Sequence, residues 1–297
     1  MLTLQRAREV VRRYAEFHQT QTFKEYVAGN RRTRQLIVQA TREQGLTPTT
    51  EGAGDLKMSI TEMLDGYAGH EHAYEIYPLF KDFALLAAAS EITYTPTLLV
   101  NYGGPESKYY MIARDNAYNE PRLRRFTFQP DLAARTRTAL WTPEDDWIFK
   151  GVSGSAANIV KHGGLVGVGA HHELQGMGTP WELILMATGG MPLHDVLRVG
   201  TIFGAISIGL DKELGSVEAG KLADLIVLDG NPLQDITNVK RVRYVMRNGQ
   251  LFQSETLDEI WPKQQKLGRP WWLDWLPPTP TSSNEPDDRT KPKQPRR

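Results

Sequence analysis

Residues 164–183 read GLVGVGAHHELQGMGTPWEL, an apolar run followed by two adjacent histidines, a carboxylate and a glycine-rich loop. The run 165–169 predicts a buried strand, and Trp181 opens a helical pattern. A buried strand that carries polar, metal-competent side chains at its C-terminal end is typical of an α/β barrel. The alternative is a strand that runs into a loop whose histidines are merely solvated.

Strand and helix patterns alternate before this stretch, at roughly 20–30 residues per unit, which indicates βαβ units and a parallel sheet. Residues 101–150 break the rhythm with Tyr, Arg, Asn and Pro, and predict a long loop that covers an active site. The expected strands are 22–27, 46–51, 69–76, 92–100 and 165–169, and the expected helices are 3–17, 31–44, 60–64, 79–90 and 152–162.

The C-terminal part changes character. After helical patterns at 181–187 and 192–208, the segments 215–230 and 241–252 are rich in strand-forming residues, and the second contains an Asn248-Gly249 turn. These two segments predict a small β module. From Lys263 on, a Pro-, Ser- and Lys-rich tail predicts disorder. Trp271, Trp272 and Trp275, just before its Pro-rich stretch 277–297, could dock on the body or on a partner.

Composition excludes several classes of function. Lys plus Arg equals Asp plus Glu at 35 each, so no nucleic-acid footprint is expected. No apolar run is long enough for membrane insertion, and there is no cysteine. If Met1 is the true start the protein is expected in the cytoplasm, because the first helix lacks the apolar core of a secretory signal. A signal peptide encoded upstream would make it periplasmic or secreted.

Two C-terminal stretches carry a resemblance to a known family. GSVEAGKLADLIVLDGNPL (215–233) and VRYVMRNGQLF (242–252) resemble the end of the metal-dependent amidohydrolase superfamily, in particular its imidazolonepropionase-like and dihydroorotase-like members. TPTTEGAGDL (47–56), DGYAGHEHA (65–73) and ITYTPTLLVNYGGP (92–105) are similar to a bacterial branch that follows a Tol-type β-propeller. The resemblance runs from about residue 4 to residue 262.

The resemblance implies a partial (β/α) TIM-like barrel, about the fourth to eighth strands, followed by a β-sandwich-type module. The expected division is 1–209 for the barrel part, 210–262 for the module and 263–297 for the tail. It also implies a divalent metal cofactor, zinc in the first place. The first-strand His-x-His of the family is not found, so this chain is expected to form a homodimer or to associate with a missing N-terminal segment.

The family pattern assigns the metal site residue by residue. Lys24 stands in the place of the fourth-strand ligand, and the fifth-strand tip holds Glu51 instead of histidine. His72 matches the sixth-strand histidine, and His70, two residues earlier, is expected on the same side of the strand as a second ligand. His171 takes the place of the eighth-strand aspartate and is the expected catalytic residue. The alternatives are a solvated Lys24, a Glu51 paired with an arginine, and strand histidines bonded to carbonyl groups.

Three further residues are expected to contact substrate, namely Tyr102, His172 and Glu182. Glu182 has the alternative role of capping the start of a helix. The implied reaction is metal-assisted hydrolysis of a carbon–nitrogen bond, an amide or cyclic amide, in a small-molecule substrate. The competing hypothesis is a catalytically inactive, truncated barrel that serves as a binding or assembly module, because the His-x-His is not found and His171 replaces the family's aspartate.

Overall fold

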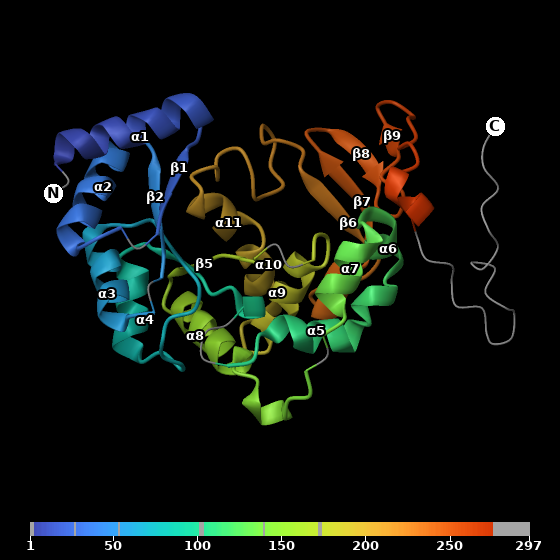
Figure 1. Ribbon diagram of the computed structural model, residues 1–297, viewed down its shortest axis with the longest axis horizontal. Coiled ribbons are helices and arrows are strands. Elements are labelled where there is room, and N and C mark those ends of the chain that lie inside the picture. Colours follow the sequence, from blue (N-terminus) through green and yellow to red (C-terminus); the bar gives the residue numbers. More distant parts are fainter. Residues whose placement is uncertain are drawn as a thin grey trace, which may run out of the picture.

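The computed structural model describes residues 3–275 except 27, 53, 101–103, 139 and 172–173. Its first sheet has five parallel strands in the order β1-β2-β3-β4-β5 (Figure 1). This confirms the predicted α/β class and parallel sheet. The strands are β1 (Thr22–Glu25), β2 (Thr47–Glu51), β3 (Gly69–Glu71), β4 (Thr93–Thr95) and β5 (Leu165–Val166).

Helices alternate with the strands along the chain, and three of them begin at side-chain caps. Thr3, Asn30 and Asp55 each accept a hydrogen bond from a backbone N–H group of the first turn. Such caps satisfy donors that a helix start leaves without intrahelical partners. These helices are α1 (Leu4–His18), α2 (Arg31–Glu43), α3 (Leu56–Asp65), α4 (Lys81–Ala89) and α8 (Phe149–Lys161).

The two faces of the parallel sheet differ in what covers them. One row of neighbouring residues is buried toward the helices, and the α3 side chain of Glu62 contacts two of its members, Thr50 and His70. The full row is Glu25, Thr50, His70, Tyr94 and Val166. Because side chains alternate along a strand, Lys24, Glu51 and Glu71 belong to the opposite face.

All five strands are shorter than the sequence predicts, and β5 ends at Val166, three residues before the end of the expected strand 165–169. The difference is largest for β3 and β4. β3 ends at Glu71 because His72 has a φ of 71°, a left-handed conformation that does not continue a strand. β4 ends at Thr95, before Pro96, which has no N–H group for the ladder. The chain then forms the short 3-10 helix η1 (Leu98–Val100). The expected strands 69–76 and 92–100 are therefore wrong beyond residues 71 and 95.

The expected loop at 101–150 is largely helical in its described part. It contains α5 (Ser107–Asp115), η2 (Ala117–Asn119), α6 (Pro121–Phe126), α7 (Gln129–Thr136) and η3 (Glu144–Asp146). Leu123 and Leu132 are 3% and 0% exposed and belong to the main core. The segment is therefore a packed helical insertion, and the prediction of a loop was wrong.

Asp115, at the end of α5, joins segments that are far apart in the chain. Its carboxylate accepts a hydrogen bond from Trp181 Nε1 at 2.6 Å and pairs with Lys240 Nζ at 2.8 Å. Trp181 belongs to α9 (Gly178–Ala187), which is followed by α10 (Leu193–Val199) and α11 (Ile202–Ser207). Lys240 ends η4 (Ile236–Lys240), which lies between the first two strands of the C-terminal sheet.

The predicted β module is an antiparallel sheet of four strands in the order β6-β7-β8-β9. The strands are β6 (Leu225–Leu228), β7 (Val242–Arg247), β8 (Gln250–Gln253) and β9 (Glu259–Trp261). The predicted Asn248-Gly249 turn joins β7 to β8. Among the described residues this sheet is a single layer, so a sandwich is not confirmed.

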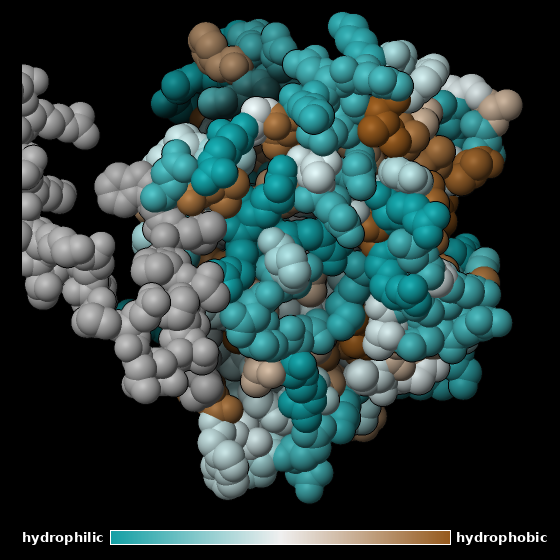
Figure 2. Space-filling model, turned by 90° about the vertical axis from the view of Figure 1, so that its right-hand side faces the viewer, coloured by the Kyte–Doolittle hydropathy of each residue, from teal (hydrophilic) through white to brown (hydrophobic). Residues whose placement is uncertain are grey.

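Part of the C-terminal tail is described. Within η5 (Trp271–Trp275), Trp272 Nε1 donates a hydrogen bond to the Arg125 carbonyl at 3.0 Å, and the Trp271 ring packs near Phe128. Trp271 and Trp272 thus dock on the body of the protein, one of the two options left open by the sequence. The surface at this end of the molecule is mostly hydrophilic, with apolar side chains in separate patches (Figure 2).

Along the described chain, no helix combines the length and apolar character needed to cross a membrane.

Candidate active site

Three predicted ligands meet at the C-terminal ends of neighbouring strands. Lys24 Nζ lies 2.8 Å from Glu51 Oε2, and His72 Nε2 lies 3.0 Å from Glu51 Oε1. Lys24 comes from β1, Glu51 is the last residue of β2, and His72 directly follows β3. In a parallel sheet these ends lie at one edge, and the left-handed turn at His72 directs its ring toward Glu51.

His171 approaches the same place from the segment after β5. Its ring centroid lies 5.3 Å from that of His72. His171 is exposed, whereas the side chain of His72 is only 4% exposed. The predicted catalytic histidine and the predicted metal ligand are therefore side by side, one open to solvent and one enclosed.

The charges of this cluster stabilise one another. Burial disfavours the charged forms of Lys24 and Glu51, yet their hydrogen bond and mutual attraction raise the pKa of Lys24 and lower that of Glu51. Burial lowers the pKa of His72, and the nearby His171 and Lys24 act in the same direction, while Glu51 opposes them. The site thus holds an ammonium, a carboxylate and a neutral imidazole. Carbamylation of Lys24 requires loss of this ammonium proton.

Glu71 is a site residue that the sequence analysis missed. It pairs with Glu51 in the β2–β3 register and lies on the same face of the sheet. Burial raises the pKa of its carboxyl, with Lys24 and His70 opposing and Glu51 reinforcing the shift. Its position in the sequence, between the predicted ligands His70 and His72, could have indicated this role. Side chains alternate along a strand, so Glu71 lies on the face opposite to His70.

His70 does not share a side with His72, contrary to expectation. Its side chain is fully buried against α3, where Nδ1 lies 3.0 Å from Glu62 Oε2, and its ring stacks on Tyr74. The reason is the conformation of His72, which lies beyond the strand, so the two-residue spacing no longer implies a common face. The structure brings Lys24, Glu51 and His72 together but leaves His70 behind the sheet.

The three predicted substrate contacts are placed as follows. Tyr102 and His172 lie outside the described residues. Glu182 is 0% exposed, and its carboxylate accepts hydrogen bonds from the backbone N–H groups of Leu98 at 3.1 Å and Leu99 at 2.7 Å. It therefore caps the start of η1 from α9, the alternative role that the sequence left open.

Glu182 should make the stability of the fold depend on pH. Burial raises the pKa of its carboxyl from the ordinary 4.5 to about 8, although the two backbone donors act in the opposite direction. Between these values the folded chain keeps a proton that the unfolded chain releases. The free energy of unfolding should therefore fall by a few kcal/mol as pH rises from 4.5 to 8, and then level off.

Glu182→Gln should remove this part of the pH dependence, because the amide does not titrate. Urea unfolding at several pH values between 5 and 9 measures the slope. Glu255→Gln, a change of the same kind at an exposed site, is the control and should keep the wild-type slope. A Glu182→Gln protein with the full wild-type slope would contradict the assignment.

Two donor atoms of this cluster have the spacing of ligands in the zinc site that the resemblance implies. Two ligand atoms of one tetrahedral zinc ion lie about 3.3 Å apart, because Zn–N and Zn–O bonds are about 2.0–2.1 Å long. The 3.0 Å between Glu51 Oε1 and His72 Nε2 is close to this value. Imidazole nitrogen and carboxylate oxygen are ordinary zinc ligands, so this pair fits an ion. Over the described residues, no group of three or more His, Asp or Glu side chains could hold one.

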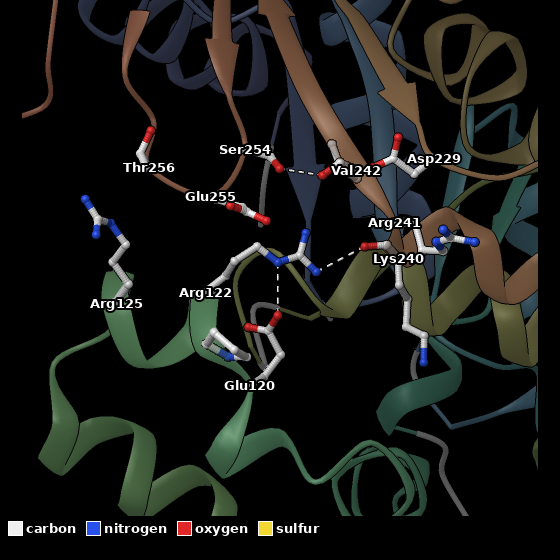
Figure 3. Close-up of a pocket in the computed structure, with 11 residues that line it drawn as sticks. Glu120, Arg122, Arg125, Asp229, Lys240, Arg241, Val242, Ser254, Glu255 and Thr256 are labelled. Carbon is white, nitrogen blue, oxygen red and sulfur yellow. Dashed lines mark hydrogen bonds and ion pairs between the residues drawn. The ribbon is translucent and has the colours of Figure 1, made fainter. Parts of the chain in front are cut away.

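A cavity of about 670 Å³ lies elsewhere, between α6 and the C-terminal sheet (Figure 3). Arg122 stands at its centre, where Nε donates to Glu120 at 3.0 Å and a terminal nitrogen donates to the Lys240 carbonyl at 3.0 Å. Its lining includes none of the predicted site residues. The central cation, Arg122, is therefore already paired with protein groups. The cavity lies where two parts of the fold meet.

Residues 35–252 match the model of the amidohydrolase family, and the chain belongs to this family. The family is generally metal-dependent. A 5-methylthioadenosine/S-adenosylhomocysteine deaminase of Moorella thermoacetica is 51% identical over 39 residues, which are 13% of this chain and 9% of that protein. The protein of the same name from Teredinibacter turnerae is 39% identical over 61 residues, 20% of this chain and 14% of its own length.

Solved structures agree on the fold. A Xaa-Pro dipeptidase aligns with a TM-score of 0.59 and 20% identity over 85% of this chain and 59% of its own. A molinate hydrolase aligns with a TM-score of 0.57 and 17% identity over 98% of this chain and 60% of its own. The chain spans at most 60% of these two structures and less than a sixth of the two deaminases. The association with a Tol-type β-propeller stays a prediction.

Proposed function

We propose that this chain provides the fourth to eighth strands of a (β/α) barrel and the attached β module of a metal-dependent hydrolase. The enzyme cleaves a carbon–nitrogen bond other than a peptide bond in a small molecule, an amide or cyclic amide. The observation that carries the proposal is the meeting of Lys24, Glu51 and His72 at one edge of a parallel sheet, with contacts of 2.8 and 3.0 Å. Membership of the amidohydrolase family and the partial similarity to two deaminases support the choice of bond.

Each residue has a distinct part in this proposal. Glu51 and His72 would hold a divalent ion, zinc in the first place, joined by Lys24 once it is carbamylated. When bound, the ion would supply an activated water and polarise the carbonyl group of the substrate. His72 is suited to ligation because burial favours its neutral form. His171, exposed beside it, would move the proton between the attacking water and the leaving nitrogen.

The proposed barrel has consequences for assembly. β1 and β5 are the two outer strands of the described sheet and have a neighbour on one side each. Such edges invite pairing with further strands. They support either a homodimer or association with an N-terminal segment that carries the remaining βα units. Size-exclusion chromatography of the chain distinguishes a dimer from a monomer, and a compact monomer would contradict the homodimer.

A second candidate function is a catalytically inactive barrel that acts as a binding or assembly module. The observation that favours it is that, in the described part of the chain, fewer than three His, Asp or Glu donors are grouped for an ion. In this case the ion pair of Lys24 with Glu51 is the final state of the site, and His72 serves only to enclose it.

Metal content and turnover separate the two candidates. Residues 1–297 are stripped of metal with a chelator and titrated with Zn²⁺ by calorimetry, and then assayed for release of ammonia or amine from a panel of amides and cyclic amides. One or two bound ions per chain, with hydrolysis that a chelator abolishes, would establish the hydrolase. A chain with neither Zn²⁺ binding nor hydrolysis would overturn it in favour of the inactive module.

A further inference from the structure

A buried carboxylate behind the sheet joins two of the strands that carry the site. Glu62, on α3, is 0% exposed, and its Oε1 accepts a hydrogen bond from Thr50 Oγ1 at 3.1 Å. Its Oε2 lies 3.0 Å from His70 Nδ1. Thr50 and His70 are paired in the β2–β3 register. One side chain therefore holds neighbouring residues of two adjacent strands.

The residues held by Glu62 directly precede those of the site. Glu51 follows Thr50, and His72 follows His70 by two positions. Because side chains alternate along a strand, Glu62 lies behind the sheet while Glu51 lies in front of it. Any shift of β2 relative to β3 would change the 3.0 Å contact between Glu51 and His72. Glu62 opposes such a shift.

His70 makes a second contact that bears on Glu51. A Cβ atom added at Gly52 would lie 2.8 Å from His70 Nε2 and 3.0 Å from Cε1, so the ring is packed against the backbone that follows Glu51. The ring also stacks on Tyr74 at a centroid distance of 4.4 Å. Glu62, Gly52 and Tyr74 thus all contact the imidazole, so a shift of the ring would press on the backbone that follows β2.

We infer that Glu62 and His70 are positioning residues, which fix the distance between the strand ends that carry Glu51 and His72. Both are 0% exposed, so they act through these two residues without touching a substrate or an ion. A buried carboxylate and imidazole are costly to desolvate, and their pairing here satisfies Glu62 on both oxygens. The inference rests on the proposed function in one respect, namely that Glu51 and His72 bind the ion.

Glu62→Ala tests this role with Zn²⁺ or Co²⁺ as the probe. Replacement of a group that orients a ligand costs about 10–100-fold in metal affinity, and we expect a loss in this range. Glu62→Gln should restore most of the affinity, because its amide can still accept from Thr50 and donate to His70. Gly52→Ala should reduce affinity without any change of charge, since the new methyl group displaces the His70 ring or the end of β2.

Ser59→Ala is the matched control, because Ser59 is a fully buried polar residue of the same helix. Among the described residues, its hydroxyl bonds to the carbonyl of Asp55, the N-cap of α3, and to neither strand. It should leave metal affinity unchanged. Imidazole ¹⁵N spectra at constant pH give a readout independent of metal, because loss of the Glu51 contact shifts the His72 signals. We expect this shift in Glu62→Ala and its absence in Ser59→Ala.

The outcomes separate the two ideas. If Glu62→Ala keeps both the metal affinity and the His72 signals of the parent chain, the positioning role is wrong. Equal losses in Glu62→Ala and Ser59→Ala would also overturn it, since general destabilisation of α3 would then be the cause. If the parent chain binds neither Zn²⁺ nor Co²⁺ but Glu62→Ala still shifts the His72 signals, the positioning role stands and the metal-dependent function fails.

Discussion

Gly189→Ala is expected to lower the free energy of unfolding by about 3 kcal/mol or more, the upper range for an added methyl group in a packed interior. A Cβ atom at this position would lie 2.5 Å from the Ser153 carbonyl oxygen, and closer still to the Ser153 carbonyl carbon and the Gly154 nitrogen. These are backbone atoms of α8, so no change of rotamer relieves the overlap. α8 and α9 would have to separate, which would also break the 2.9 Å hydrogen bond from Ser153 Oγ to the Leu185 carbonyl.

The same helix contact offers a matched control. In Gly154→Ala the nearest atom to the new Cβ would be the Gly189 carbonyl oxygen at 3.9 Å, an ordinary contact. Alanine is preferred to glycine in a helix interior by about 0.5–1 kcal/mol, so this variant should be slightly more stable. Urea unfolding of both proteins measures the difference. Equal stability of Gly189→Ala and the parent chain would show that α8 and α9 are not this close.

His72→Ala is expected to reduce Zn²⁺ affinity by more than about 100-fold, because a change behind a ligand already costs about 10–100-fold. His72 is the enclosed imidazole of the site, and its Nε2 is one of the two donor atoms whose spacing fits an ion. His194→Ala is the control, because the His194 side chain is 74% exposed and lies far along the sequence on α10. It should bind Zn²⁺ like the parent chain.

His171→Ala separates ligation from proton transfer in the same experiment. If His171 moves protons, as proposed, its removal should lower the rate of hydrolysis while Zn²⁺ affinity stays close to that of the parent. A His72→Ala chain that binds Zn²⁺ as tightly as the parent would contradict the ligand assignment. A loss of affinity in His171→Ala as large as in His72→Ala would make His171 a ligand instead.

Much of the sheet could be predicted because its strands follow local rules. The sequence 46–51 predicts a strand that ends at Glu51, and β2 ends at that residue in the structure. The meeting of Lys24, Glu51 and His72 followed from the family pattern, since each stands at the end of a consecutive parallel strand. The Asn248-Gly249 turn was equally local, because this pair is a strong hairpin signal.

The side assigned to His70 could not be predicted, because it depends on one backbone angle. His72 adopts a φ of 71°, and the sequence His-Glu-His-Ala does not by itself predict this left-handed conformation. A strand extended to residue 76 put His70 and His72 on one side. With β3 ending at Glu71, His70 faces α3 and Glu71 faces the site.

The helices between 101 and 150 were missed for a different reason. Proline-rich sequence predicts a loop, whereas Pro121 and Pro130 both stand in the first turn of a helix. Proline is favoured there, because its missing N–H group would have had no helical partner. Glu120 reinforces the first of these starts by accepting from the Leu123 N–H group at 2.7 Å. Both prolines and Glu120 therefore mark the starts of helices and not a loop.

The junction at Asp115 bears on the order in which the chain assembles during synthesis. Its two contacts span 66 and 125 residues, so neither can close until a long stretch of later chain has left the ribosome. The parallel strands, by contrast, pair in sequential order. The parallel sheet can therefore form strand by strand as the chain is synthesised. The ion pair of Asp115 with Lys240, next to the antiparallel sheet, can form only after Lys240 is translated. Until then, the Asp115 carboxylate lacks the ammonium group that pairs with it in the folded chain.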